Sequence, residues 1–132
     1  MGQTRLWPMK YPRAFSSPPF YIIKAAEDDL RKLYEKSGNK AKLISGLEKR
    51  MKYLQENGPL AVKHEEWFDR LTSANGELYE MRFSKMKNLG NLRIIYCFLK
   101  GDICLLHVFQ ERKDSDTDLA IKVSLERKRG LQ

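Results

Sequence analysis

This sequence has few of the residues that build metal centres, disulfide scaffolds or membrane segments. Its 132 residues include two cysteines and two histidines, and no CxxC motif or Cys/His cluster has metal-ligand spacing. No apolar run approaches the ~20 residues of a transmembrane helix. Arg5 and Lys10 are not followed by a continuous apolar stretch, so this end does not have the form of a secretory signal. We therefore expect no metal, no cofactor and no membrane association.

The two cysteines, Cys97 and Cys104, both lie in apolar segments with strand character. Buried, reduced thiols are the expected state, and such thiols are typical of cytosolic proteins. The chain is long enough to bury a core as one domain without disulfides or structural metal. The sequence therefore predicts a cytoplasmic protein.

Charge of one sign dominates the composition. Lys and Arg total 25 against 17 Asp and Glu, which gives a formal net charge of +8. An excess of this size favours a polyanionic partner, namely nucleic acid, a ribosome or an acidic protein.

Proline is concentrated at the start of the chain. Four of the five prolines lie in residues 1–19, interleaved with aromatic residues. Proline at this density opposes regular backbone hydrogen bonding, so we expect residues 1–19 to form an arm outside the main core. The arm either docks through its aromatic residues or is a disordered tail. Residues 20–132 then form the folded domain.

Two helices are expected after a short strand at 20–23. The first has an acidic first turn at Glu27, Asp28 and Asp29, and residues 37–39 stop it. The second has an apolar stripe at helical spacing, with Arg50 and several lysines on other faces; the stripe consists of Leu43, Leu47, Met51 and Leu54. Residues 60–77 give no clear pattern, and they form either a short helical turn or an irregular connection.

The second half predicts three antiparallel strands and a closing helix. From Tyr79 to Ser84 apolar residues alternate with charged or polar ones, whereas 92–99 and 103–109 are apolar on both parities, as central strands covered on both faces should be. From Asp116 the composition is helical. We therefore predict an α+β fold, with a small, mainly antiparallel sheet packed by two N-terminal helices and a C-terminal helix.

Cationic side chains accompany these apolar strands, and they form either a solvated face or an anion site; they are Arg82, Lys85, Lys87, Arg93, His107, Arg112 and Lys113. Arg93 is flanked by Leu92, Ile94 and Ile95, and an unpaired charge buried there is costly. We favour a phosphate contact for Arg93 over a structural ion pair.

Three short motifs and their order carry a resemblance. They are Leu78-Tyr79-Glu80-Met81-Arg82, Leu92-Arg93-Ile94-Ile95-Tyr96 and Leu105-Leu106-His107-Val108-Phe109, followed by Ser124 and Arg127 in an AxxR-like pattern with Ser in place of Ala. Over roughly residues 20 to 129 the chain resembles the RelE/ParE superfamily of bacterial toxins, most closely its HigB-like, phage-derived branch. The paired lysines that often follow the third strand are replaced here by Gln110, Glu111, Arg112 and Lys113.

The resemblance implies a RelE-like fold and the toxin of a type II toxin–antitoxin system. Such a toxin is a ribosome-dependent mRNA endonuclease, which cleaves without metal by attack of a 2′-hydroxyl on the adjacent phosphate. The implied partners are a helix-turn-helix, HigA-like antitoxin, the ribosome and mRNA, with operator DNA bound only through the antitoxin. The alternative is a non-catalytic binding protein on the same scaffold, including a ParE-like gyrase poison.

Site roles follow from this reaction. Arg82 and Arg93 are expected to stabilise or position the phosphate, although Arg82 could instead be a solvated residue paired with Glu80 or Glu111. His107 is either an acid or base or, alternatively, a hydrogen-bonded packing residue. Lys113 is a further catalytic candidate or a solvated cation. Lys85, Lys87 and Arg112 are expected to bind RNA, and no metal site is expected.

The hairpin between the last two strands decides whether Arg93 and His107 can act together. A type II′ turn at Gly101 and Asp102 pairs Lys100 with Ile103, places Tyr96 opposite His107, and leaves Arg93 on the other face. A shift of one residue instead pairs Arg93 with Phe109, on the face of His107. Turn chemistry favours the first register, so we expect Arg82 and Arg93 to contribute more to growth arrest in cells than His107 does.

Overall fold

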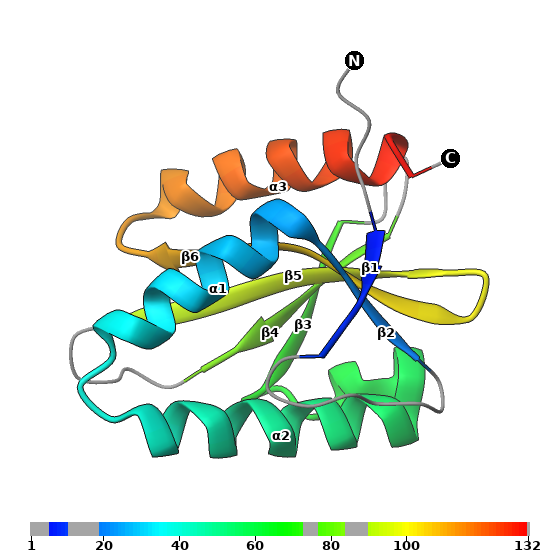
Figure 1. Cartoon of the computed structure of the whole chain (residues 1–132). Helices are drawn as coiled ribbons and strands as arrows, with labels where there is room; N and C mark the ends of the chain where they lie inside the picture. Colours follow the sequence, from blue (N-terminus) through cyan, green and yellow to red (C-terminus); the bar gives the residue numbers. More distant parts are fainter. Residues whose placement is uncertain (1–5, 11–18, 73–76, 84–89, 132) are drawn as a thin grey trace.

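The computed structural model describes residues 6–10, 19–72, 77–83 and 90–131 (Figure 1). Their chain order is β1 (Leu6–Pro8), β2 (Phe20–Ile23), α1 (Lys24–Lys36), α2 (Lys40–Asn57), the 3-10 helix η1 (Gly58–Lys63), β3 (Phe68–Thr72), β4 (Leu78–Arg82), β5 (Asn91–Leu99), β6 (Asp102–Glu111) and α3 (Asp114–Arg129). The α+β class is confirmed. In the described part of the chain no helix is long and apolar enough to cross a membrane.

A six-stranded mixed sheet of order β1-β2-β6-β5-β4-β3 organises the molecule. β2 pairs with β6 in parallel, and the other neighbours are antiparallel. The mainly antiparallel arrangement is as predicted, but the sheet is larger than predicted because β1 and β3 extend its edges.

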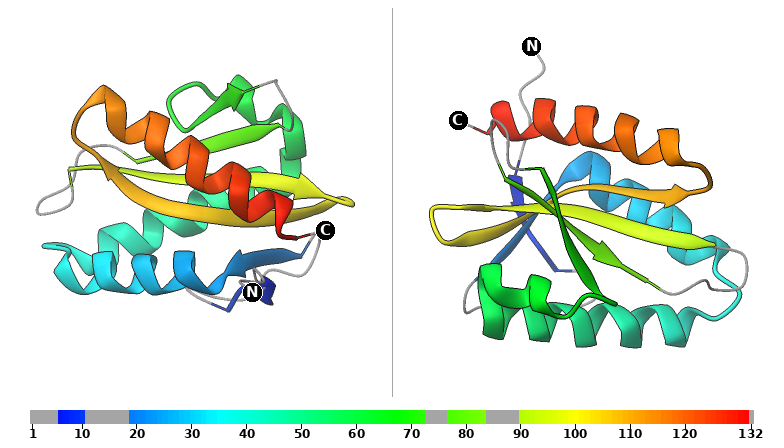
Figure 2. Two further views of the ribbon diagram at one scale, coloured as in Figure 1. Left: turned by 90° about the horizontal axis from the view of Figure 1, so that it is seen from above. Right: turned by 180° about the vertical axis from the view of Figure 1, so that it is seen from behind.

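Helices cover the sheet on both sides. α3 and α2 lie on opposite sides of the strands in Figure 1 and in the right-hand view of Figure 2, and α1 packs against β2 and β6. Ile94 and Ile95 point to opposite faces of β5 and are both fully buried. Cover on two faces explains why β5 and β6 are apolar on both parities.

The expected N-terminal arm differs in part from the structure. Leu6–Pro8 pairs with β2 as an edge strand, and Met9 is only 3% exposed in the core. A proline is tolerated at such an edge, because its missing N–H removes no interior ladder bond. These residues therefore belong to the sheet and its core, while residues 1–5 and 11–18 lie outside the described part.

Residues 60–77 contain a strand that the sequence did not reveal. β3 pairs with β4 and has an irregular register between Arg70 and Thr72. Phe68 is buried, whereas Arg70, two positions later, is exposed, so strict apolar alternation is absent. An edge strand without that alternation gives no strand signal.

The helices begin slightly earlier than predicted. α1 begins at Lys24, directly after β2, and its N-cap Ile23 makes no side-chain cap. Asn39 caps α2 by accepting a hydrogen bond from Lys42 N. α3 begins at Asp114 and not at Asp116.

The predicted turn between β5 and β6 is wrong. Leu99 pairs with Asp102, so Lys100 and Gly101 are the central residues, with φ of 53° and 85°. Two positive φ values are the pattern of a type I′ turn. Positive φ is uncommon for a lysine, which is why turn chemistry favoured the neighbouring position.

A β-bulge then changes the register along the same hairpin. Tyr96 pairs with Leu105 but Ile95 pairs with His107, so Leu106 is the extra residue. Beyond the bulge Arg93 pairs with Phe109, and it shares a sheet face with His107. The prediction that Arg93 and His107 occupy opposite faces is therefore wrong.

Candidate functional site

Charged side chains gather on the face of the sheet that α3 covers. Arg82 lies directly opposite Arg93, and Asp69 lies opposite Glu80. Alternation along the strands places both pairs and Glu111 on one face. We refer to Asp69, Glu80, Arg82, Arg93 and Glu111 as the arginine–carboxylate cluster.

Carboxylates pair with both arginines of this cluster. Arg82 Nη2 lies 2.6 Å from Asp69 Oδ2, and Arg82 Nε lies 3.0 Å from Glu80 Oε1. Arg93 Nη2 lies 3.2 Å from Glu111 Oε1. The ion pair expected as the alternative role of Arg82 is thus present with Glu80, and Asp69 adds a second one. Arg93 has the ion pair that the sequence analysis disfavoured.

The partners leave one buried arginine donor unused. Arg93 Nε is buried and has no hydrogen-bond partner among the described residues. The Arg82 side chain is 34% exposed and that of Arg93 17% exposed, so both remain partly open to solvent. Solvent thus reaches part of each arginine side chain but not Arg93 Nε, and an external ligand would contact the exposed part of these side chains.

Asp69 is the cluster residue that was not expected, and Glu80 was expected only as a partner of Arg82. Glu80 is the most buried carboxylate of the cluster. It is 3% exposed, and burial raises the pKa of its carboxyl, while the hydrogen bond from Arg82 acts in the opposite direction. The alternation Tyr79-Glu80-Met81 placed Glu80 on a polar face, but could not show that α3 covers that face. Glu80 is too buried to contact a large ligand directly.

Glu111 is held in its ionised form. Thr117 Oγ1 on α3 donates to Glu111 Oε2, and this bond, together with Arg93, lowers the pKa of the carboxyl. α3 therefore fixes the carboxylate that neutralises Arg93.

His107 is on the same face but is held by a different partner. Arg127 Nη1 lies 3.2 Å from His107 Nδ1 and donates to the Leu106 carbonyl at 2.7 Å. Burial, and then the charge of Arg127, lower the pKa of His107 to about 4. The ring is thus neutral at pH 7, with Nδ1 accepting from Arg127. This is the arrangement of a hydrogen-bonded packing residue.

The catalytic candidate Lys113 and the predicted RNA-binding residues are less well placed. Arg112 and Lys113 are exposed between β6 and α3, and their backbone N–H groups donate to Asp116 Oδ2 at 2.8 and 3.0 Å. They adjoin Glu111 along the chain. Lys85 and Lys87 lie outside the described residues. The structure therefore brings Arg82, Arg93 and His107 to one face, with Lys113 at its margin.

Comparisons of the chain with protein-family models, with curated proteins and with solved structures found no match. Among the described residues no group of three or more His, Cys, Asp or Glu side chains could hold a metal ion.

Proposed function

We propose that this protein is a ribosome-dependent mRNA endonuclease, the toxin of a type II toxin–antitoxin system with a RelE-like fold. The observation that carries the proposal is the pairing of Arg82 with Arg93, the motif arginines of two strands, directly opposite each other on one face. β2 pairs in parallel with β6, and helices lie on both sides of the sheet. Both features are compatible with a RelE-like scaffold.

Charge stabilisation is the part of the reaction that the cluster supports best. Attack of a 2′-hydroxyl, which loses its proton to water, forms a new O–P bond and a pentavalent state of increased negative charge. The P–O5′ bond then breaks, and the 5′-oxygen takes up a proton from water. Arginine binds phosphate oxygens through two parallel N–H donors. A phosphate at Arg82 and Arg93 would replace Asp69 and Glu111 as the acceptor.

The remaining residues take supporting roles in this proposal. Arg112 and Lys113, both exposed, contact the RNA backbone as point charges. His107, with its lowered pKa and its bond to Arg127, keeps α3 seated on β6 and is not a proton donor at neutral pH. Lys113, earlier a catalytic candidate, is assigned to binding because its side chain is exposed.

The proposed partners follow from the same hypothesis. The net charge of +8 favours an acidic or amphipathic partner protein, and the resemblance implies a helix-turn-helix antitoxin. The ribosome and mRNA are the targets in the cytoplasm, and operator DNA is bound only through the antitoxin.

The test is induction in cells followed by an in vitro translation assay. We expect growth arrest, with mRNA cut only when ribosomes are present, and loss of both effects in an Arg82→Ala/Arg93→Ala variant. Arg129→Ala, an exposed arginine at the end of α3, is the matched control. Intact mRNA with translating ribosomes and folded protein would contradict the proposal.

A non-catalytic binding protein is the second candidate, and one observation favours it. Both cluster arginines already have carboxylate partners, and the cluster holds three carboxylates for two arginines. A gyrase poison of this class leaves mRNA whole and damages DNA. Growth arrest with intact mRNA and induced DNA damage would favour this alternative.

A further inference from the structure

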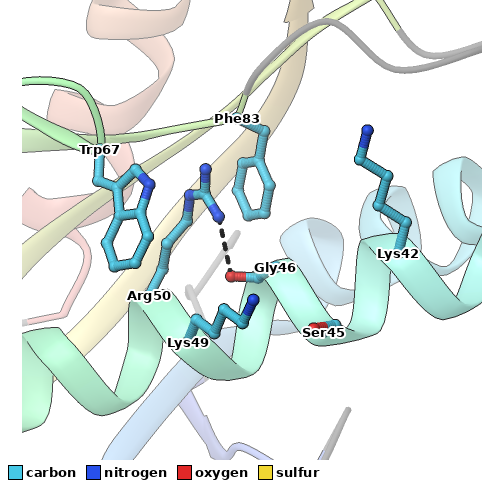
Figure 3. A pocket seen from close by; sticks show the side chains of 7 residues that line it. All are labelled: Lys42, Ser45, Gly46, Lys49, Arg50, Trp67 and Phe83. Carbon is cyan, nitrogen blue, oxygen red and sulfur yellow. Dashed lines mark hydrogen bonds between the residues drawn. The ribbon is translucent and has the colours of Figure 1, made fainter.

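A second cationic site lies on the other side of the sheet, at α2. Arg50 is 7% exposed, and its guanidinium lies between two aromatic rings (Figure 3). The Arg50 Cζ is 4.8 Å from the ring centroid of Trp67 and 4.3 Å from that of Phe83. Because the rings cover both faces of the guanidinium, only its edge remains available for further hydrogen bonds.

The buried charge of Arg50 has no carboxylate partner in the described part of the chain. Its Nε donates to the Arg82 carbonyl at 2.6 Å, and its Nη1 donates to the Gly46 carbonyl at 3.1 Å. Both acceptors are neutral. Burial lowers the pKa of Arg50 to about 10, so the group is still charged at pH 7. A buried charge with neutral partners alone is an unusual state, which an anionic ligand would relieve.

A cavity of about 230 Å³ adjoins this guanidinium. Lys42 and Lys49, both exposed at their ends, lie along the same side of α2 with Ser45 between them (Figure 3). No acidic residue lines the cavity in the part of the chain that the structure describes. Three cations, one hydroxyl and two aromatic rings therefore surround a space large enough for a small anionic group.

Gly46 keeps this cavity open. A Cβ at this position would lie 3.2 Å from Arg50 Nη1 and 3.5 Å from Phe83 Cε2. Glycine within a helix costs about 1 kcal/mol relative to alanine. The missing side chain leaves the edge of Arg50 accessible from the cavity.

We propose that this pocket binds a phosphate group. The in-plane donors of Arg50, the ammonium groups of Lys42 and Lys49 and the Ser45 hydroxyl match the several acceptor oxygens of a phosphate, which carries up to two negative charges as a monoester and one as a backbone diester. A carboxylate offers fewer acceptor oxygens than either form of phosphate. The phosphate belongs either to a free monoester, such as a nucleotide, or to a nucleic-acid backbone. The site does not depend on the proposed endonuclease function, because it lies on the opposite side of the sheet from the arginine–carboxylate cluster.

Isothermal titration and thermal unfolding of the whole chain test the proposal. The probes are inorganic phosphate, uridine 5′-monophosphate and a short oligouridylate, with acetate at matched ionic strength. We expect phosphate-bearing probes to bind and raise the Tm, and acetate to do neither. Tighter binding of the monophosphate identifies a free monoester as the source, and tighter binding of the oligonucleotide identifies a backbone phosphate. Acetate binding equal to phosphate, or no binding of any probe, overturns the proposal.

Variants assign the binding to this pocket. Lys42→Gln/Lys49→Gln should weaken phosphate binding by about tenfold or more without changing the fold, because both side chains are exposed. Gly46→Ala should block the cavity while the circular dichroism spectrum stays the same. Lys52→Gln, an exposed lysine of α2 that does not line the cavity, is the matched control. Equal affinity in all three variants would show that the phosphate binds elsewhere and would overturn the assignment.

Discussion

Arg82 and Arg93 face each other directly across β4 and β5. Like charges directly opposite each other in a sheet destabilise it, and this cost is offset only when opposite charges lie beside them. Glu80, Asp69 and Glu111 provide those counter-charges. The sheet therefore holds two cations closer together than their charges favour, in an arrangement that a phosphate could bridge.

Replacement of Arg93 should separate the role of the cluster from that of His107. Arg93→Ala is expected to abolish growth arrest, because it removes the donors proposed to bind the phosphate. His107→Gln should retain most of the arrest, since the ring is neutral and serves in packing. Growth curves after induction measure both effects, with circular dichroism to confirm folding. Equal loss of toxicity in two folded variants would show that His107 takes part in the function.

Removal of the Glu111 charge should strengthen RNA binding. In Glu111→Gln the carboxylate no longer competes with phosphate for Arg93. A partly exposed ion pair contributes up to about 1 kcal/mol, so we expect an increase in RNA affinity of up to about fivefold at low salt. Fluorescence anisotropy with labelled RNA measures it.

Glu126→Gln, an exposed acidic residue of α3, removes the same charge away from the cluster and should change the affinity little. An unchanged affinity in Glu111→Gln would argue against a phosphate contact at Arg93.

The stability of the protein should depend on His107 below neutral pH. Its pKa is about 4 in the folded state against 6.5 for the ordinary residue, so the unfolded chain binds more protons between these values. Stability is therefore fully present above about pH 6.5 and falls as the pH is lowered toward 4, by up to about 3 kcal/mol for this group alone.

Urea unfolding of the wild type and of His107→Gln across this range isolates the contribution, because Glu80 and Glu111 titrate in both proteins. The variant should show the shallower decline between pH 6.5 and 4. Parallel curves would contradict the lowered pKa.

Arg127 should stabilise the packing of α3 against β6. Arg127→Ala removes the hydrogen bonds to the Leu106 carbonyl and to His107. A hydrogen bond from a charged group contributes about 1.5 to 3 kcal/mol, and chemical denaturation should show a loss of that order. The pKa of His107 should also rise, which NMR titration of the ring can detect. Arg129→Ala, the exposed control, should change neither value.

Several elements could be predicted because their signal is local. Alternation identified β4, and apolar runs on both parities identified β5 and β6 as central strands. β3 could not be predicted, because its pairing with β4 is irregular and its residues do not alternate. The bulge at Leu106 depends on contacts between strands, and the turn depends on a lysine with positive φ; the sequence displays neither.

The sequence spacing of Arg50 indicates burial, whereas its charge indicates exposure to solvent. Leu43, Leu47, Arg50 and Leu54 follow the spacing i, i+4, i+7 and i+11, which places Arg50 on the apolar stripe of α2. Its charge suggested a solvated face instead. The rings of Trp67 and Phe83, which make its burial possible, come from residues far away in the sequence.

The parallel pairing of β2 with β6 determines when this fold can exist during synthesis. Phe20 lies beside Ile103, so the first of these strands waits for a partner made on the order of 80 residues later. Before β6 emerges, the newly made chain has no central strand between β2 and β5, and their edges are open to pairing with other chains. A polypeptide interrupted before β6 would therefore lack both Glu111 and the sheet that aligns Arg93 with it. The arginine–carboxylate cluster cannot form until the last strand has been made.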